Sequence, residues 1–222
     1  MIFLLIPVLF MSCGSEGGTS NNNGDSNNDR LKTPKPTQSI INQYTADLEE
    51  MAKQSREQEL QIADAVAKAD GEEIDYNIYA EQTRVDSVNM IKLSKMLDAN
   101  GWIATTHYGE AASNRALAIL NKASSNYQVY YLTMVTNALS AGEIKPAGFA
   151  EVYDKAMIAQ GKNQLYGTQM SFNETEGINK VHPIEDEANI EQRRKVVGLP
   201  PMTAYWSNFG IVYPDNGSST DH

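Results

Sequence analysis

The spacing of apolar residues constrains the fold of this chain more than any other feature. From Ser39 to Ala69, apolar side chains recur at steps of three and four residues, which is the period of a helix with one buried face. The same period predicts four further helices, over about 78–97, 110–123, 126–139 and 146–161. The residues predicted to face the core in the first two helices are Ile41, Tyr44, Leu48, Met51, Ile62 and Val66, then Val85, Val88, Leu93 and Met96.

Glycine and proline mark where several of these helices start and stop. Gly71, Gly101 and Gly142 can end the helices before them in the left-handed conformation, and Pro146 suits the first turn of a helix. We expect the segment 102–108 to be a loop between the second and third helices.

The pattern changes at Gln164. Residues 165–172 (LYGTQMSF) carry the aromatic and Thr residues typical of strands, residues 173–177 offer turn chemistry, and residues 178–184 (INKVHPI) can return as a partner strand. The predicted fold class is therefore mainly α with a small β-hairpin, a multi-helix domain with the hairpin near its C-terminal end.

A last helix is predicted after the hairpin. Asp186 can cap its first turn, and the helix should run to Val197. Gly198 and Leu199 match a Schellman stop, and Pro200-Pro201 prevents the helix from continuing.

The N-terminus has the pattern of a targeting segment. The apolar run 2–11 is too short to span the roughly 30 Å of bilayer hydrocarbon as a helix, but it has the length of a signal-peptide core. It ends at Ser12-Cys13-Gly14, and Cys13 is the only cysteine. This resembles a bacterial lipoprotein signal, which implies cleavage before Cys13 and a lipid on its sulfur. No Lys or Arg precedes the run, and a buried apolar N-terminus with an incidental cysteine is the alternative.

The composition of the residues after Cys13 predicts how the rest of the chain is organised. Residues after the cysteine are rich in Gly, Ser and Asn and have almost nothing apolar to bury, so we expect a flexible tether. The predicted plan is a signal peptide at 1–12, the lipidated Cys13 and tether at 13–37, the helical domain with its hairpin at 38–213, and a disordered tail at 214–222. The expected location is the bacterial cell envelope, most simply the outer membrane, with the leaflet and the oligomeric state left open.

Charge argues against one class of partner. The formal net charge is −10, which repels a nucleic-acid backbone unless a local basic stripe exists. The closest approach to a stripe is Arg193-Arg194-Lys195, which follows several acidic residues and is interpreted as an ion-paired helix surface. We therefore predict no nucleic-acid partner, and the expected partners are a membrane, through the lipid, and a glycan or peptide ligand.

Several short strings resemble the signature of domain-of-unknown-function family 6624. They are Gly101-Trp102, Gln164–Gln169 (QLYGTQ), Arg193-Arg194 and Gly198–Pro201 (GLPP), and the resemblance covers about Val85 to Tyr205. It implies a fold and a functional surface but no reaction. One departure is Lys122-Ala123, where the family tends to carry a His-Ala pair, so an activity that needs that histidine would be absent here.

The candidate site centres on the QLYGTQ segment, whose amides, phenol and hydroxyl suit a sugar or peptide. The alternative is that these side chains form a structural lock between the hairpin and the helices. His107 and His182 could share a cleft with it, although surface histidines are the simpler interpretation. The candidate ligand-binding residues are Trp102, His107, Gln164, Tyr166, Thr168, Gln169 and Arg193.

Common catalytic and metal-binding motifs are absent from the sequence, so we predict no metal and no cofactor. The leading hypothesis is an envelope module that binds a ligand or partner. The alternative is a hydrolase or transferase acting on envelope glycan or peptide, which should gather His107 and a carboxylate with the QLYGTQ side chains in one pocket. Asp86-Ser87-Val88 also matches a short bacterial O-glycosylation pattern, and whether Ser87 is modified stays open.

Overall fold

The computed structural model describes residues 35–69, 75, 77–173, 178–211 and 213, all within one unit, Thr33–His222. The predicted signal peptide, Cys13, nearly all of the tether and the tail at 214–222 lie outside the described residues, as does Gly71.

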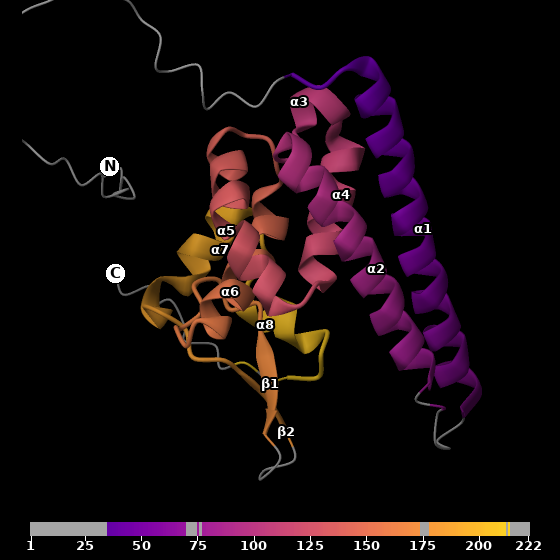
Figure 1. Cartoon of the computed structure of the whole chain (residues 1–222). Helices are drawn as coiled ribbons and strands as arrows, with labels where there is room; N and C mark the ends of the chain where they lie inside the picture. Colours follow the sequence, from indigo (N-terminus) through magenta and orange to yellow (C-terminus); the bar gives the residue numbers. More distant parts are fainter. Residues whose placement is uncertain (1–34, 70–74, 76, 174–177, 212, 214–222) are drawn as a thin grey trace, which may run out of the picture. The chain divides into compact units, whose positions relative to one another are not determined.

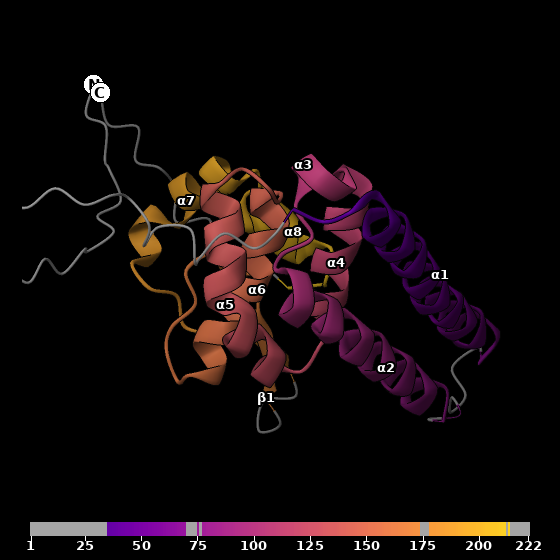
Figure 2. The ribbon, with the colours of Figure 1, turned by 45° about the horizontal axis from the view of Figure 1, so that its top comes forward.

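The mainly helical fold class with one small hairpin is confirmed (Figures 1 and 2). The elements are α1 (Gln38–Ala69), α2 (Asn77–Asn100), α3 (Thr105–Tyr108), α4 (Glu110–Lys122), α5 (Ser125–Ser140), α6 (Pro146–Ala159), β1 (Met170–Asn173), β2 (Ile178–Val181), a 3-10 turn (Glu187–Asn189), α7 (Ile190–Val197) and α8 (Met202–Ser207). The two strands pair antiparallel, with Met170 opposite Val181.

The long helices α1 and α2 lie side by side in both views, and α4 packs against them and against α6 (Figures 1 and 2). Because α4 presents Ala112 and Ala116 on its buried face, its neighbours can approach closely. Gly148 serves the same purpose on α6, since a Cβ there would lie 2.6 Å from Leu117 Cδ2. The core around α4 contains Leu48, Met51, Leu93, Leu120, Val135 and Phe149, and a smaller cluster joins Ile190, Met202 and Trp206.

Two predicted core positions are wrong. Val66 on α1 is 49% exposed and Val88 on α2 is 37% exposed. Both residues have the correct helical spacing, but the packing leaves each of them partly uncovered, and Val88 lines an open groove between α1 and α2. Spacing predicts which residues share a face, and only the packing decides how much of that face is covered.

Three predicted elements also need correction. The expected loop 102–108 contains the short helix α3, and the QLYGTQ segment is not a strand, because the hairpin begins only at Met170. Asp186 does not cap the first turn of the last predicted helix: it has a left-handed φ of 47°, its side chain makes no capping hydrogen bond, and a 3-10 turn separates it from α7. The Schellman stop is confirmed, since Leu199 N donates to Arg194 O over 2.9 Å, but a further helix, α8, follows Pro201.

Candidate functional site

The segment 164–169, called the QLYGTQ loop below, is closed by the side chain of Gln164. This side chain is fully buried, and its Nε2 donates to the carbonyl oxygens of Gln169 at 3.0 Å and His182 at 2.8 Å. Its Oε1 accepts from the Gln169 backbone N–H at 2.9 Å. Gln164 therefore joins both ends of the loop to the chain that leaves the hairpin, as the lock alternative expects.

A buried carboxylate on α6 collects the N–H groups of the loop. Asp154 is 0% exposed and accepts from the backbone N–H groups of Leu165 at 2.8 Å, Tyr166 at 3.0 Å and Thr168 at 3.0 Å. The Thr168 hydroxyl donates to the same carboxylate at 2.8 Å. Burial raises the pKa of Asp154, and these hydrogen bonds oppose that shift because they favour the charged form.

Sequence reasoning missed Asp154 because acidic residues on an amphipathic helix usually face water. The signal that could have found it is its place one helical turn after Ala150, which is also fully buried. An acidic residue on the apolar face of a helix needs hydrogen-bond donors from elsewhere in the chain.

Two arginines of α7 hold the carbonyl groups of the same loop. Arg193 is 19% exposed at its side chain, and its Nε donates to Leu165 O at 2.9 Å. Arg194 is 0% exposed, its Nη1 donates to Tyr166 O at 2.5 Å, and its guanidinium lies 4.7 Å from the centre of the Tyr205 ring. We call Asp154, Gln164, Arg193 and Arg194 the polar lock, because the loop's peptide groups lie between an anion and two cations.

The interpretation of Arg193-Arg194-Lys195 as an ion-paired surface is therefore wrong for Arg194. That residue lies between Ile190 and Val197 on the buried face of α7, where four- and three-residue steps bring the three side chains together. Burial lowers the pKa of Arg194, yet its donors still reach carbonyl oxygens.

Gly167 is required by the backbone at the centre of the loop. Its φ is +66°, and a Cβ there would lie 2.7 Å from both Sδ and Cε of Met202. The close approach that glycine permits is thus made by α8, which packs its buried Met202 against the loop.

The structure does not bring every predicted residue to this loop. Trp102 is buried in the core, where its Nε1 donates to Ser113 Oγ at 3.3 Å. His107 is exposed on α3, which lies at the opposite end of the helices from the hairpin (Figures 1 and 2). Thr168 is occupied by the polar lock, and Tyr166 is half-buried with its ring against Tyr153.

Gln169 instead meets His182 in a groove beside the loop, which we call the loop groove. It has a volume of about 270 Å³ and combines residues from the hairpin end, α5 and α6. Its lining is Ala123, Ser125, Gln128, Lys155, Ile158, Ala159, Gln169, Met170 and His182. Sequence analysis named Gln169 and His182 but missed Ser125, Gln128 and Lys155, which are brought in by helix packing.

The floor of the loop groove is built on the C-terminal end of α4. Gln128 is almost fully buried, and its Nε2 donates to the carbonyl oxygens of Leu120, Asn121 and Ala123 at 3.1–3.2 Å. Lys155 Nζ donates to Asn121 O as well. A cation and an amide thus satisfy carbonyl groups that a helix end leaves without partners. Burial lowers the pKa of Lys155, and the nearby Glu151 opposes that shift.

Some polar groups of the groove have no partner within the described residues. The His182 imidazole and the Ser125 hydroxyl make no hydrogen bond there, and Gln128 Oε1 is a buried acceptor without a donor. No Asp or Glu among the described residues lines this groove. The arrangement can therefore donate and accept hydrogen bonds, but it offers no carboxylate for acid–base chemistry.

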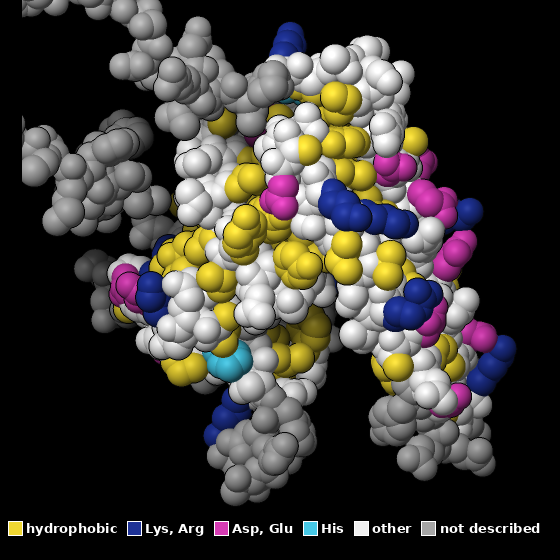
Figure 3. Space-filling view, viewed as in Figure 1, with side chains coloured by type: hydrophobic (Ala, Val, Ile, Leu, Met, Phe, Trp, Pro, Cys, Tyr) yellow, Lys and Arg dark blue, Asp and Glu magenta, His cyan; other side chains and the backbone are white. Residues whose placement is uncertain are grey.

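The surface seen in the view of Figure 1 carries different kinds of side chain over different helices. Figure 3 shows charged side chains of both signs along α1 and α2, while hydrophobic side chains gather nearer α5.

The described part of the chain has no group of three or more His, Cys, Asp or Glu side chains able to hold a metal ion. Within that same part, no helix is both long enough and apolar enough to cross a membrane.

These features define a class: a helical domain in which a buried polar lock fixes a loop beside a small polar groove. The chain belongs to a family of unknown function (DUF6624), whose model matches residues 46–213. The match confirms the family resemblance, and it covers more of the chain than the stretch from Val85 to Tyr205 over which the sequence strings showed that resemblance. No curated protein and no solved structure matches the chain.

Proposed function

We propose that this protein is a lipid-anchored module of the bacterial cell envelope that binds a glycan or peptide in the loop groove. The anchor rests on the sequence alone, on the apolar run that ends at Ser12-Cys13. Two or three acyl chains, at about 0.8 kcal/mol per buried methylene, hold a protein at a membrane where one myristoyl chain does not.

The observation that carries the binding proposal is the convergence of free hydrogen-bonding groups on a rigid groove. Ser125 and His182 offer polar groups without partners among the described residues, and Gln169, whose Nε2 donates to Thr168 Oγ1 at 2.9 Å, adds its Oε1. The three residues come from separate parts of the chain, and the polar lock fixes the loop that contains Gln169. Ile158 and Met170 add apolar surface next to them. Such a groove complements a ligand that carries hydroxyl or amide groups on an otherwise apolar ring or side chain.

The volume limits what the groove can enclose. Pockets for drug-sized ligands occupy roughly 300–1,000 Å³, and this groove has about 270 Å³. It therefore suits one sugar ring or one to two short amino-acid residues of a longer ligand.

Geometry favours binding over the alternative hydrolase or transferase. That activity was expected to gather His107 and a carboxylate with the QLYGTQ side chains. His107 instead lies at the other end of the helices, and within the described residues no carboxylate lines the groove. Structural hydrogen bonds of the polar lock already engage the side chains of Gln164, Thr168 and Arg193.

The lipid anchor is tested by expressing the full-length gene in a lipoprotein-competent bacterium with labelled palmitate. We expect label in the wild-type protein and none in Cys13→Ser. Absence of label, or equal label in both proteins, contradicts the anchor without touching the groove.

The groove is tested by calorimetric titration of the full-length protein, in an uncharged polyoxyethylene detergent that carries no sugar, with N,N′,N″-triacetylchitotriose and with tri-alanine. We expect one probe to bind and His182→Gln to weaken that binding at least tenfold. His107→Gln is the matched control, because it makes the same change on an exposed histidine far from the groove. Equal losses in the two variants, or no binding of either probe, would remove the loop groove as the site.

A further inference from the structure

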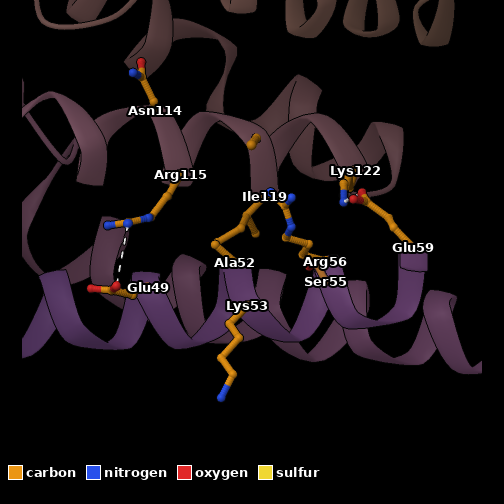
Figure 4. Close-up of a pocket in the computed structure, with 11 residues that line it drawn as sticks. Glu49, Ala52, Lys53, Ser55, Arg56, Glu59, Asn114, Arg115, Ile119 and Lys122 are labelled. Carbon is orange, nitrogen blue, oxygen red and sulfur yellow. Dashed lines mark hydrogen bonds and ion pairs between the residues drawn. The ribbon is translucent and has the colours of Figure 1, made fainter. Parts of the chain in front are cut away.

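A second groove lies between α1 and α4 and shares no lining residue with the loop groove. Its volume is about 580 Å³, within the range of roughly 300–1,000 Å³ that is usual for small-molecule sites. Ala52 of α1 lies opposite Ile119 of α4 (Figure 4), and Ala118 of α4 also lines the groove. Because Ala52 and Ala118 are small, the helices leave open space between them.

Two ion pairs connect the helices across this groove. Glu49 of α1 lies 3.9 Å from Arg115 of α4, and Glu59 of α1 is paired with Lys122 of α4 (Figure 4). Each pair satisfies one anion and one cation. Glu49 and Glu59 are therefore not available to a further basic side chain that points between the two helices.

That further side chain is Arg56. It extends from α1 towards α4, and its guanidinium lies beside Ile119 between the two ion pairs (Figure 4). Within the described part of the chain, Arg56 makes no hydrogen bond and no ion pair. Lys53 lines the edge of the groove, but its side chain points away from α4 (Figure 4) and lies 3.9 Å from Glu57.

The groove is thus locally cationic in an acidic protein. The groove is lined by four cations, Lys53, Arg56, Arg115 and Lys122, and by two anions, Glu49 and Glu59. Since Glu57 offsets Lys53 from outside the lining, the local balance is +1 in a chain of net charge −10. A guanidinium presents five donors in a planar fork that matches two oxygens of a carboxylate or phosphate. Arg56 is exposed, so its guanidinium can be reached from solvent, and no carboxylate among the described residues pairs with it.

We infer that the groove between α1 and α4 binds an oxyanion, a carboxylate or phosphate group, on Arg56. The oxygens accept from the guanidinium fork, and a short apolar part of the ligand lies over Ala52 and Ile119. Arg115 and Lys122 stay paired and position the walls of the groove. This site is independent of the loop groove and of the lipid anchor.

The test is a nuclear magnetic resonance titration of the full-length, ¹⁵N-labelled protein in uncharged dodecyl maltoside. Sodium phosphate and sodium acetate are added separately at constant ionic strength, so that the two arms distinguish a phosphate from a carboxylate site. We expect saturable shifts of the backbone N–H signals of Ala52 and Ile119 with at least one of the two ions.

Arg56→Gln should weaken the binding at least fivefold, because it removes the charge and the fork together. Lys68→Gln is the matched control: it removes the same charge from the same helix, at an exposed residue that does not line the groove and pairs with Asp64, and should change the affinity less than twofold. Unchanged thermal melting of both variants shows that the fold is retained. Equal weakening in the two variants, or no saturable shift with either ion, overturns the site.

Discussion

Replacing Asp154 with Asn perturbs the polar lock with the smallest change of shape. In the wild-type protein, one carboxylate oxygen accepts from Leu165 N and Tyr166 N, and the other accepts from Thr168 N and Thr168 Oγ1. An Asn amide keeps one acceptor oxygen, and its NH₂ group faces donors on the other side. The Thr168 hydroxyl can rotate to accept, but the Thr168 N–H cannot.

The expected cost follows from these contacts. A buried donor left without an acceptor costs about 1–3 kcal/mol, and the bonds that remain lose the strength that a charged acceptor gives, also about 1–2 kcal/mol together. Removing a buried charge offsets part of this loss. We therefore expect Asp154→Asn to lower the free energy of unfolding by about 2–4 kcal/mol.

Urea denaturation of the full-length protein at pH 7 measures this difference. The matched control is Asp64→Asn on α1, an exposed carboxylate that pairs with Lys68 at 2.7 Å, and it should cost less than about 0.5 kcal/mol. If Asp154→Asn costs no more than Asp64→Asn, the buried carboxylate does not hold the loop and the polar lock is refuted.

Three further predictions address the same region. Arg193→Lys should cost about 1–3 kcal/mol in urea denaturation, because an ammonium cannot replace a fork whose Nε and Nη2 donate to two different carbonyl groups; a cost below about 0.5 kcal/mol would make Arg193 a solvated surface residue. Gly167→Ala should cost about 2–5 kcal/mol from its positive φ and its clash with Met202, and a smaller penalty is expected in a Met202→Ala background, whereas an equal penalty would exclude the clash. Burial raises the pKa of Glu151, and the charge of Lys155 opposes that shift. The folded state therefore binds this proton more tightly than the unfolded state does. As a result, the free energy of unfolding falls as pH rises from the unfolded-state pKa of Glu151 through its raised folded-state pKa. Glu151→Gln removes that dependence and should stabilise the protein more at pH 7.5 than at pH 4, as urea denaturation at the two values would show; an equal effect at both would contradict the shift.

The helices could be predicted from the sequence because their causes are local. The period of apolar residues and the glycines and prolines between them act within a few positions of the chain, so α1, α2, α4, α5 and α6 begin and end within about three residues of their predicted bounds. The Schellman stop at Gly198 is equally local. The element missed there, α8, is only six residues long and follows two prolines, where local pattern is weakest.

The candidate site could be predicted only in part. Sequence strings pointed to the QLYGTQ loop and to Arg193, and the structure places both in one hydrogen-bonded unit. The expected company of Trp102 and His107 was not found, because their separation from the loop depends on the order in which the helices pack. The residues that complete the loop groove, such as Gln128 and Lys155, carry no local pattern that sets them apart.

The sequence by itself determined which segments are helical, where the hairpin lies and which family the chain resembles. Only the tertiary structure decided which polar residues leave water. Asp154 and Arg194 are of residue types that usually face water, yet both lie on the buried face of their helices, because each can be paired with peptide groups 11 to 28 positions away. Burial of a charge is tolerable only when distant partners satisfy it, and those partners exist only once the helices have packed around the loop.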